Sequence, residues 1–159
     1  MSINNNWQSL VNTIAGLLTA QNKTVAVAES CTAGNIAVML TSVSGSSNFF
    51  EGGVIAYSNK VKINQLQVKK QDIVKYSSVS ESVVRQMAEG VKRQFQSDYA
   101  IATTGYAGPT GNNVGQVFIA ITSKERSCII DCFFDGKRKA IIYKASIKAL
   151  SSFLSEIKK

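Results

Sequence analysis

Serine hydroxyls and lysine amines are the side chains in this sequence whose spacing could support covalent catalysis. Ser46 and Ser47 stand in one turn-rich segment, and Tyr57 and Lys62 follow in the next. A serine hydroxyl attacks only when a base removes its proton, and a neutral lysine can be that base when burial lowers its pKa. Tyr57 and Lys62 are separated by a predicted strand-to-helix turn, so both could face one pocket. This combination indicates acyl transfer or amide hydrolysis.

A second group of polar residues forms a turn between a predicted buried strand and a predicted helix. Ser30, Cys31 and Thr32 place hydroxyls and backbone N–H groups at a helix N-terminus, where an anion or a developing oxyanion is stabilised. A thiolate at Cys31 would be stabilised there too, although a free cysteine is also commonly buried as a small apolar group. Thr104 opens a glycine-rich loop after another predicted strand.

The spacing alone also allows these serines and Lys62 to have a purely structural role. Ser46 and Ser47 would cap a short helix, which serine often does, and Lys62 would lie on the surface. The glycine-rich loop after Thr104 lacks the full spacing of the known phosphate-binding fingerprints. The loop could instead be a mobile connection between two strands and bind no ligand.

The absence of histidine narrows the possible chemistry. It excludes Ser–His and Cys–His catalysis and removes the most common zinc ligand. The three cysteines, Cys31, Cys128 and Cys132, include no Cys-x-x-Cys pair, so we expect no metal site. Proton transfer in an enzyme of this composition must use lysine, tyrosine, aspartate or glutamate.

Charge and hydropathy restrict the classes of partner. The net charge is +8, but the basic residues are spread over several segments without interleaved aromatic residues. This pattern favours a solvated surface or an anionic small molecule, and we expect no nucleic-acid partner. No apolar run reaches the length of a membrane span, and the N-terminus lacks a secretory pattern. We therefore expect a cytoplasmic protein with reduced thiols and no membrane partner.

The elements that must position these residues alternate along the chain. Helical periodicity covers residues 7–21, 33–42, 59–67, 81–96 and 137–157, and strand patterns cover 23–28, 54–57, 99–103, 115–122 and 127–134. Residues 69–79 are predicted to be irregular. The alternation and the late hairpin predict a single three-layer α/β/α domain over residues 1–159, with a mixed, mostly parallel sheet. Ser30, Tyr57 and Thr104 would then meet beyond the carboxyl ends of the strands.

Several motifs stand in the same order as in a known protein family. They are AESCTAG (28–34), GSS (45–47), GGVIAYSN (52–59), VSE (79–81), MAEG (87–90), TGYAGP (104–109) and VGQVFIA (114–120). From about residue 7 to about residue 155, the chain closely resembles the C-terminal domain family of the competence/damage-inducible protein CinA. Stand-alone members of that family are nicotinamide-nucleotide amidohydrolases. A series of matching motifs is far more specific than any single one.

The resemblance implies hydrolysis of the carboxamide of nicotinamide mononucleotide to nicotinate mononucleotide and ammonia, in pyridine-nucleotide recycling. The family's serine–lysine mechanism implies Ser47 as nucleophile, Lys62 as its base and Tyr57 as the residue that orients the lysine. Ser46 is the competing nucleophile. The implied substrate-binding residues are Ser30, Cys31, Thr32, Ser46, Thr104, Gly105, Gly108 and Arg138. The resemblance also implies no metal or other cofactor, a phosphorylated nucleotide as substrate, and a homodimer.

The sequence departs from the family pattern at three positions. Ala33 stands where a second glycine is usual, and Ser44 stands where a proline is usual. Ile142 occupies a position, just after Arg138, where the family tends to have another arginine. Such an arginine could bind substrate phosphate or stabilise charge. The departures therefore leave an alternative function, that of a catalytically inactive paralogue that binds a nucleotide or a protein partner.

Overall fold

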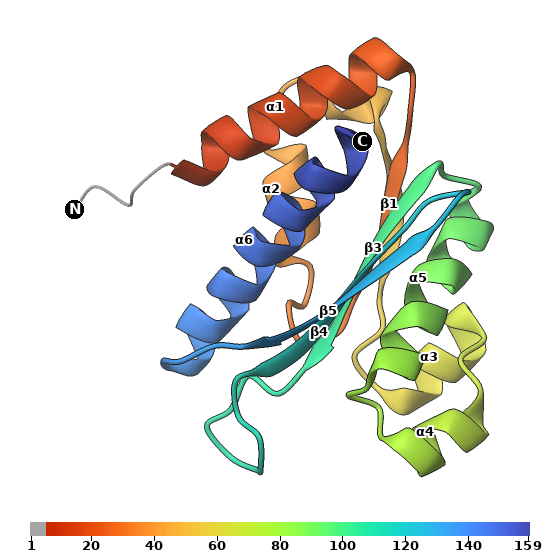
Figure 1. The fold of residues 1–159 in the computed structure, drawn as a ribbon, viewed down its shortest axis with the longest axis vertical. Helices are drawn as coiled ribbons and strands as arrows, with labels where there is room; N and C mark the ends of the chain where they lie inside the picture. The colour runs from red at the N-terminus through yellow and green to blue at the C-terminus, as the bar shows by residue number, and fades with distance from the viewer. Residues whose placement is uncertain (1–5) are drawn as a thin grey trace.

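The computed structural model describes residues 6–159, in which helices pack on both faces of a central five-stranded sheet (Figure 1). The elements in chain order are α1 (Asn6–Gln21), β1 (Val25–Glu29), α2 (Asn35–Thr41), the 3₁₀ turn η1 (Ser46–Asn48), β2 (Phe50–Ile55), α3 (Asn59–Leu66), α4 (Lys70–Tyr76), α5 (Glu81–Phe95), β3 (Tyr99–Gly105), β4 (Gln116–Thr122), β5 (Ser127–Phe133) and α6 (Arg138–Ile157). None of these helices is long and apolar enough to cross a membrane.

The sheet has the strand order β2-β1-β3-β4-β5. Strand β1 pairs in parallel with both β2 and β3, so that Glu29 lies opposite Ile55 on one side and Thr103 on the other. The β3–β4 and β4–β5 pairs are antiparallel. The expected single α/β domain with a mixed sheet is confirmed. However, parallel and antiparallel pairs are equally frequent, so the sheet is not mostly parallel.

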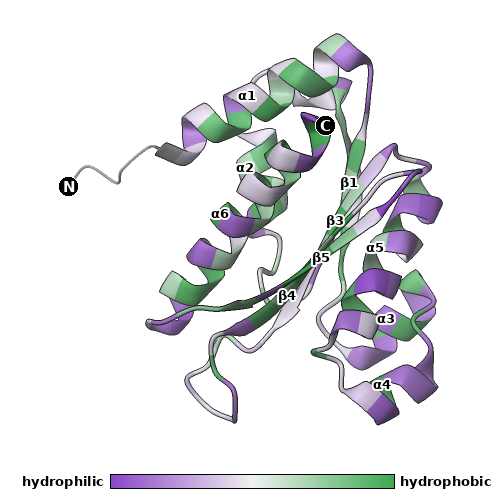
Figure 2. Ribbon diagram, viewed as in Figure 1, coloured by the Kyte–Doolittle hydropathy of each residue, from purple (hydrophilic) through white to green (hydrophobic). Residues whose placement is uncertain are grey.

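Side-chain size differs between the two faces of the sheet. Val25 and Val27 of β1 join an apolar core with α1, α2 and α6, whereas Ala26 and Ala28 join a second core with α5. Successive residues of a strand point to opposite faces, so this alternation divides the core into two layers. Figure 2 shows apolar residues along the strands and in the helices on both faces of the sheet. The alanines allow α5 to lie close to the strands.

Two glycines allow close contacts that position the strands and helices around the later site. A β-carbon at Gly53 of β2 would lie 2.5 Å from the backbone oxygen of Val27, so only glycine fits beside β1 there. A β-carbon at Gly90 of α5 would collide with the backbone oxygen of Leu66 at the end of α3. Gly53 thus allows β2 to approach β1 closely, and Gly90 allows α3 to pack against α5.

Helix α4 is the main difference from the predicted elements, since residues 69–79 were expected to be irregular. No residue of α4 is buried, and its N-cap Lys69 makes no side-chain capping bond. Instead, the side chain of Gln86 on α5 accepts a hydrogen bond from the Lys69 N–H at 2.9 Å and donates to Asp72 at 2.7 Å. These tertiary contacts stabilise a helix that has no local periodic signal.

Candidate active site

A cavity of about 200 Å³ lies beyond the carboxyl ends of β1, β2 and β3. Its lining comes from five segments of the chain and comprises Ser30, Cys31, Tyr57, Asn59, Lys62, Ser78, Val79, Thr104, Gly105, Tyr106, Ala107 and Arg138. Ser30, Tyr57 and Thr104 thus meet at one edge of the sheet, as predicted from their positions after three strands. Ligands of open α/β sheets bind at this edge.

Lys62 is the buried amine of this cavity, with a side chain that is 2% exposed. The Ser58 hydroxyl caps α3 by accepting a hydrogen bond from the N–H of Val61, and Lys62 on the first turn then points back toward the sheet. Its Nζ donates to Ser30 Oγ at 3.0 Å, to the Ala56 carbonyl at 2.9 Å and to the Tyr57 carbonyl at 3.3 Å. Burial lowers the pKa of Lys62 below its usual 10.5.

The three contacts of Lys62 match the requirements of a general base. A neutral amine has two N–H bonds and one lone pair. When the two carbonyl oxygens accept the two N–H bonds, the lone pair is directed at Ser30 Oγ, from which it can accept a proton. None of the ion pairs formed by residues 6–159 includes Lys62, so no carboxylate stabilises its charged form directly.

The turn that carries Ser30 is held by a carboxylate that the sequence interpretation did not single out. Glu29 is fully buried at the end of β1 and accepts a 2.6 Å hydrogen bond from the Thr32 hydroxyl. Its two oxygens also accept the N–H groups of Ile36 and Ala37 on the first turn of α2, both at 3.0 Å. The sequence did contain a signal for Glu29. An acidic residue shortly before a predicted helix can accept hydrogen bonds from the free N–H groups of the first helical turn.

Cys31 lies beside Ser30 in the cavity wall but is held as a thiol. Burial raises the pKa of Cys31 to about 12, against a smaller opposite effect of its hydrogen bond with Thr103. The thiolate is the nucleophilic form of cysteine, so Cys31 is not poised to attack at neutral pH. Cys31 therefore fits the alternative in which a free cysteine is buried as a small apolar group. A neutral thiol also leaves the ammonium of Lys62 without a negative charge next to it.

Arg138 closes one side of the cavity by joining two segments. Its guanidinium donates to the Gly108 carbonyl at 2.6 Å and to the Tyr57 hydroxyl at 2.9 Å. The side chain of Tyr57 is therefore turned toward Arg138 and is more than half exposed. The family resemblance implies that Tyr57 orients Lys62. In the structure the backbone carbonyl of Tyr57 contacts the lysine, and its hydroxyl does not.

The glycine-rich loop after β3 forms the remaining wall. The Thr104 hydroxyl donates to the Ser78 carbonyl at 2.8 Å, which ties this wall to the segment before α5. A β-carbon at Gly105 would lie 2.7 Å from the Gln116 carbonyl, so this position requires glycine. Ala107 lines the cavity, and its N–H donates to no acceptor within residues 6–159. Sequence analysis did not predict the contribution of Ser78.

Ser46 and Ser47 lie outside this cavity, contrary to the predicted pairing of Ser47 with Lys62. Both serines are in η1, directly before β2, whereas Lys62 comes after it. The six residues of β2 separate the two ends by roughly 20 Å at about 3.3 Å per residue. Neither serine serves as the N-cap of η1, which is Gly45. The structure brings Ser30, and not Ser47, to the amine.

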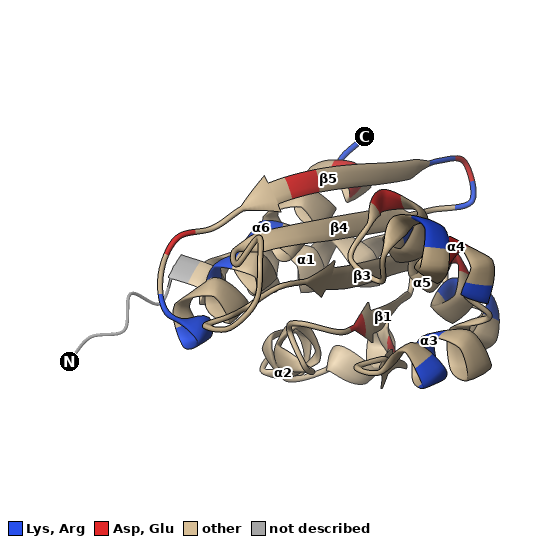
Figure 3. Cartoon of the chain, turned by 90° about the horizontal axis from the view of Figure 1, so that it is seen from below, with Lys and Arg blue, Asp and Glu red and all other residues tan. Residues whose placement is uncertain are grey.

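The charged residues of the cavity are all basic. Lys62 and Arg138 are the only ionisable cations of its lining, and the lining contains no carboxylate. Figure 3 shows basic residues at the start of α6 and on α3. Such an arrangement favours an anionic ligand. Within the described part of the chain, no three histidine, cysteine, aspartate or glutamate side chains gather closely enough to hold a metal ion.

Residues 7–157 match the sequence model of the CinA C-terminal domain. A CinA-like protein of Flavobacterium psychrophilum is 39% identical over 156 residues, which are 96% of this chain and 37% of that protein. The crystal structure of the competence/damage inducible protein CihA from Agrobacterium tumefaciens is 30% identical, with a TM-score of 0.94 and full coverage of both chains. The competence damage-inducible protein A from Klebsiella pneumoniae is 32% identical, with a TM-score of 0.93 over 97% of this chain and 98% of that one. The chain spans a little over a third of the length of the curated relatives it matches.

Proposed function

The chain belongs to the CinA C-terminal domain family, and from this membership and the geometry of the cavity we propose that it is a nicotinamide-nucleotide amidohydrolase. The proposed reaction converts nicotinamide mononucleotide and water to nicotinate mononucleotide and ammonia. The single observation that carries the mechanism is the 3.0 Å contact between Lys62 Nζ and Ser30 Oγ. We assign Ser30 as the nucleophile in place of Ser47.

The proposed first half-reaction begins when Lys62 removes the proton of Ser30 and the alkoxide attacks the carboxamide carbon. The C–O bond forms as the carbonyl π electrons move to oxygen, which becomes the oxyanion. The N–H of Ala107 is a candidate donor to that oxygen. Collapse of the intermediate breaks the C–N bond, and the ammonium of Lys62 returns its proton so that ammonia leaves. The product is a nicotinate ester of Ser30.

The proposed second half-reaction hydrolyses that ester with the same two groups. Lys62, again neutral, takes a proton from water while the water oxygen attacks the ester carbon. The C–O bond to Ser30 then breaks, and the serine regains a proton from the Lys62 ammonium. The lowered pKa of Lys62 supports this cycle because the amine must be neutral before each attack and protonated before each departure.

A phosphorylated nucleotide suits the charge of the cavity. With Lys62 occupied by the reaction, Arg138 is the cation of the lining that can meet a phosphate or ribose oxygen. Two of its donors already contact Gly108 and Tyr57, so substrate would extend or replace a network that holds the guanidinium in place. The homodimer and the cytoplasmic location expected from sequence are part of the same proposal.

A comparison of serine variants tests this assignment. The purified protein is incubated with nicotinamide mononucleotide, and ammonia and nicotinate mononucleotide are measured. We expect Ser30→Ala and Lys62→Ala each to reduce turnover by about a thousandfold or more, while Ser47→Ala retains most of it. Circular dichroism checks that each variant is folded. Loss of turnover in Ser47→Ala with Ser30→Ala active would overturn the assignment.

A catalytically inactive binder is the second candidate, favoured by Ile142 at a position where the family tends to have arginine. In the structure Ile142 is half-buried against the apolar core and does not line the cavity. The cavity therefore has Arg138 as its remaining cation besides Lys62. This candidate predicts saturable binding of nicotinamide mononucleotide with no release of ammonia, and equal affinity in Ser30→Ala.

A further inference from the structure

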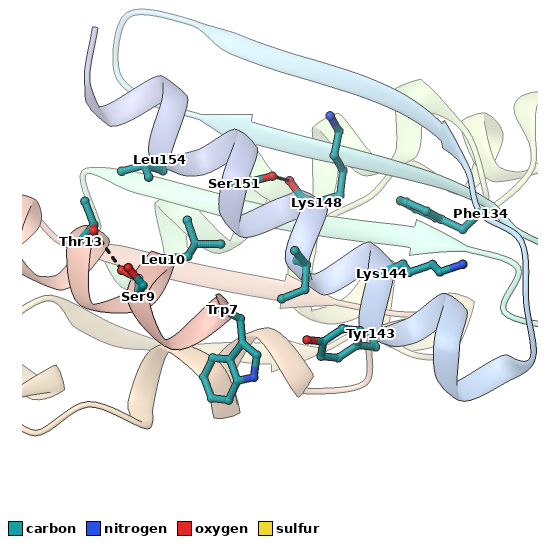
Figure 4. Close-up of a pocket in the computed structure, with 11 residues that line it drawn as sticks. Trp7, Ser9, Leu10, Thr13, Phe134, Tyr143, Lys144, Lys148, Ser151 and Leu154 are labelled. Carbon is teal, nitrogen blue, oxygen red and sulfur yellow. Dashed lines mark hydrogen bonds between the residues drawn. The ribbon is translucent and has the colours of Figure 1, made fainter. Parts of the chain in front are cut away.

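A second concave surface, which we call the α6 groove, shares no residue with the candidate active site. Its volume is about 720 Å³ (Figure 4). The outer face of α6 forms its floor, α1 forms one wall, and the segment after β5 contributes to the other. The apolar residues of the groove are Trp7, Leu10, Phe134, Tyr143, Ile147 and Leu154. A contiguous apolar surface of this kind usually marks a binding site.

The polar residues of the α6 groove differ between its two sides. Lys144 and Lys148 are one turn apart on α6, and both side chains are exposed. On α1 the polar residues are Ser9 and Thr13, which carry no charge. Among residues 6–159, no carboxylate lines the groove. The groove thus combines an apolar floor with one cationic edge and one neutral edge.

The length of the groove fits a helical occupant. Its lining on α6 runs from Tyr143 to Leu154, about 16 Å at about 1.5 Å per residue, or three helical turns. A helix laid along it would place apolar residues at intervals of three and four on the floor. Acidic residues one turn apart on that helix would match Lys144 and Lys148. A second copy of this chain docked through the same face fits less well, because it would bring Lys144 and Lys148 of both copies together.

From these features we propose that the α6 groove docks an acidic amphipathic helix of a partner protein. The proposal does not depend on the amidohydrolase assignment. Trp7 is the only tryptophan in the sequence and lines the groove, so its emission reports occupancy directly. The groove also leaves the cavity around Lys62 open, so a docked helix and a nucleotide can bind together.

Two synthetic helical peptides of about 18 residues test the proposal. Both have the same leucine positions, and they differ only in carrying glutamate or lysine beside the leucine stripe. We expect the glutamate peptide to shift Trp7 emission to the blue and to saturate, with a Kd of about 10 µM. We expect the lysine peptide to bind at least tenfold more weakly, and added salt to weaken the glutamate peptide.

Two groove variants and two matched controls distinguish docking in the groove from non-specific peptide binding. Ile147→Asp should abolish binding, whereas Val74→Asp on exposed α4 should not. The double variant Lys144→Glu with Lys148→Glu should prefer the lysine peptide, and the same double change at Lys70 and Lys75 should not. The Lys144→Glu, Lys148→Glu variant alters only exposed side chains. It therefore still tests docking in the groove if Ile147→Asp is unstable.

Three outcomes would overturn the proposal. The first is no binding of the glutamate peptide by the wild-type protein. The second is equal binding of both peptides, unaffected by the charge reversal at Lys144 and Lys148. The third is self-association in analytical ultracentrifugation that Ile147→Asp abolishes, which would identify a second copy as the occupant.

Discussion

Replacing Lys62 with methionine is expected to abolish ammonia release and to change the free energy of unfolding at pH 7 by no more than about 2 kcal/mol. The variant leaves the carbonyls of Ala56 and Tyr57 without their donor, and each buried unpaired acceptor costs about 1–3 kcal/mol. It also removes an amine that is 2% exposed, and burying one ammonium costs several kcal/mol. The two effects are opposite and of similar size.

The pH dependence of the same variant gives the sharper test. Because the folded-state pKa of Lys62 lies below 10.5, the unfolded chain holds more protons between these two values. The stability of the wild-type protein should therefore rise relative to Lys62→Met as pH increases through that window. Urea unfolding of both proteins from pH 6 to pH 10 measures the difference.

Two results would refute this reasoning about Lys62. A loss of more than about 4 kcal/mol in Lys62→Met at pH 7 would identify the lysine as a net stabilising anchor. A difference in unfolding free energy that stays flat across the pH range would mean that burial does not lower the pKa of the amine. Either result would remove the physical basis for the proposed role of Lys62 as a base.

Four further perturbations follow from the site. The turnover number for ammonia release should rise with pH, with a midpoint below 10.5, and a rate that falls with pH would contradict a lysine base. Arg138→Gln should raise the KM for nicotinamide mononucleotide about tenfold or more in steady-state assays, with a smaller effect on kcat. Ala33 has a φ of +51°, so Ala33→Gly should raise the free energy of unfolding by about 1 kcal/mol in urea titrations. Glu29→Gln should lower that energy by about 2–4 kcal/mol, because an amide cannot accept all three hydrogen bonds made by the carboxylate.

Much of the fold follows from periodic patterns in the sequence, and the exceptions have a common cause. Helix α5 has a strong apolar stripe and begins at a Ser80 cap, whose hydroxyl accepts the N–H of Val83 at 3.3 Å. Helix α4 has neither, and it depends on Gln86 from another helix. Strand β2 begins at Phe50, before the predicted start, because its glycines weaken a strand pattern while serving close packing. Contacts between distant segments cannot be seen in local spacing.

The location of the candidate site was predictable from the sequence, but the pairing of Ser30 with Lys62 was not. Ser30 and Tyr57 follow strands, Thr104 lies at the end of one, and the structure gathers all three at one cavity. Residue type alone did not distinguish Ser30 from Ser47, since both lie in short polar turns next to glycine-containing segments. The buried Glu29 escaped notice because its partners, the N–H groups at the start of α2, become available only once that helix has formed.

The direction of β2 places the two serines at different distances from Lys62. A residue that follows one parallel strand can reach a residue that follows the adjacent strand, because their carboxyl ends lie at the same edge. Ser30 follows β1 and Lys62 follows β2, and their side chains meet at 3.0 Å. Ser47 precedes β2, so a strand of roughly 20 Å separates it from Lys62, a gap that a serine and a lysine side chain together do not span. Of these two serines, Ser30 is therefore the one that can pair with Lys62 within one chain.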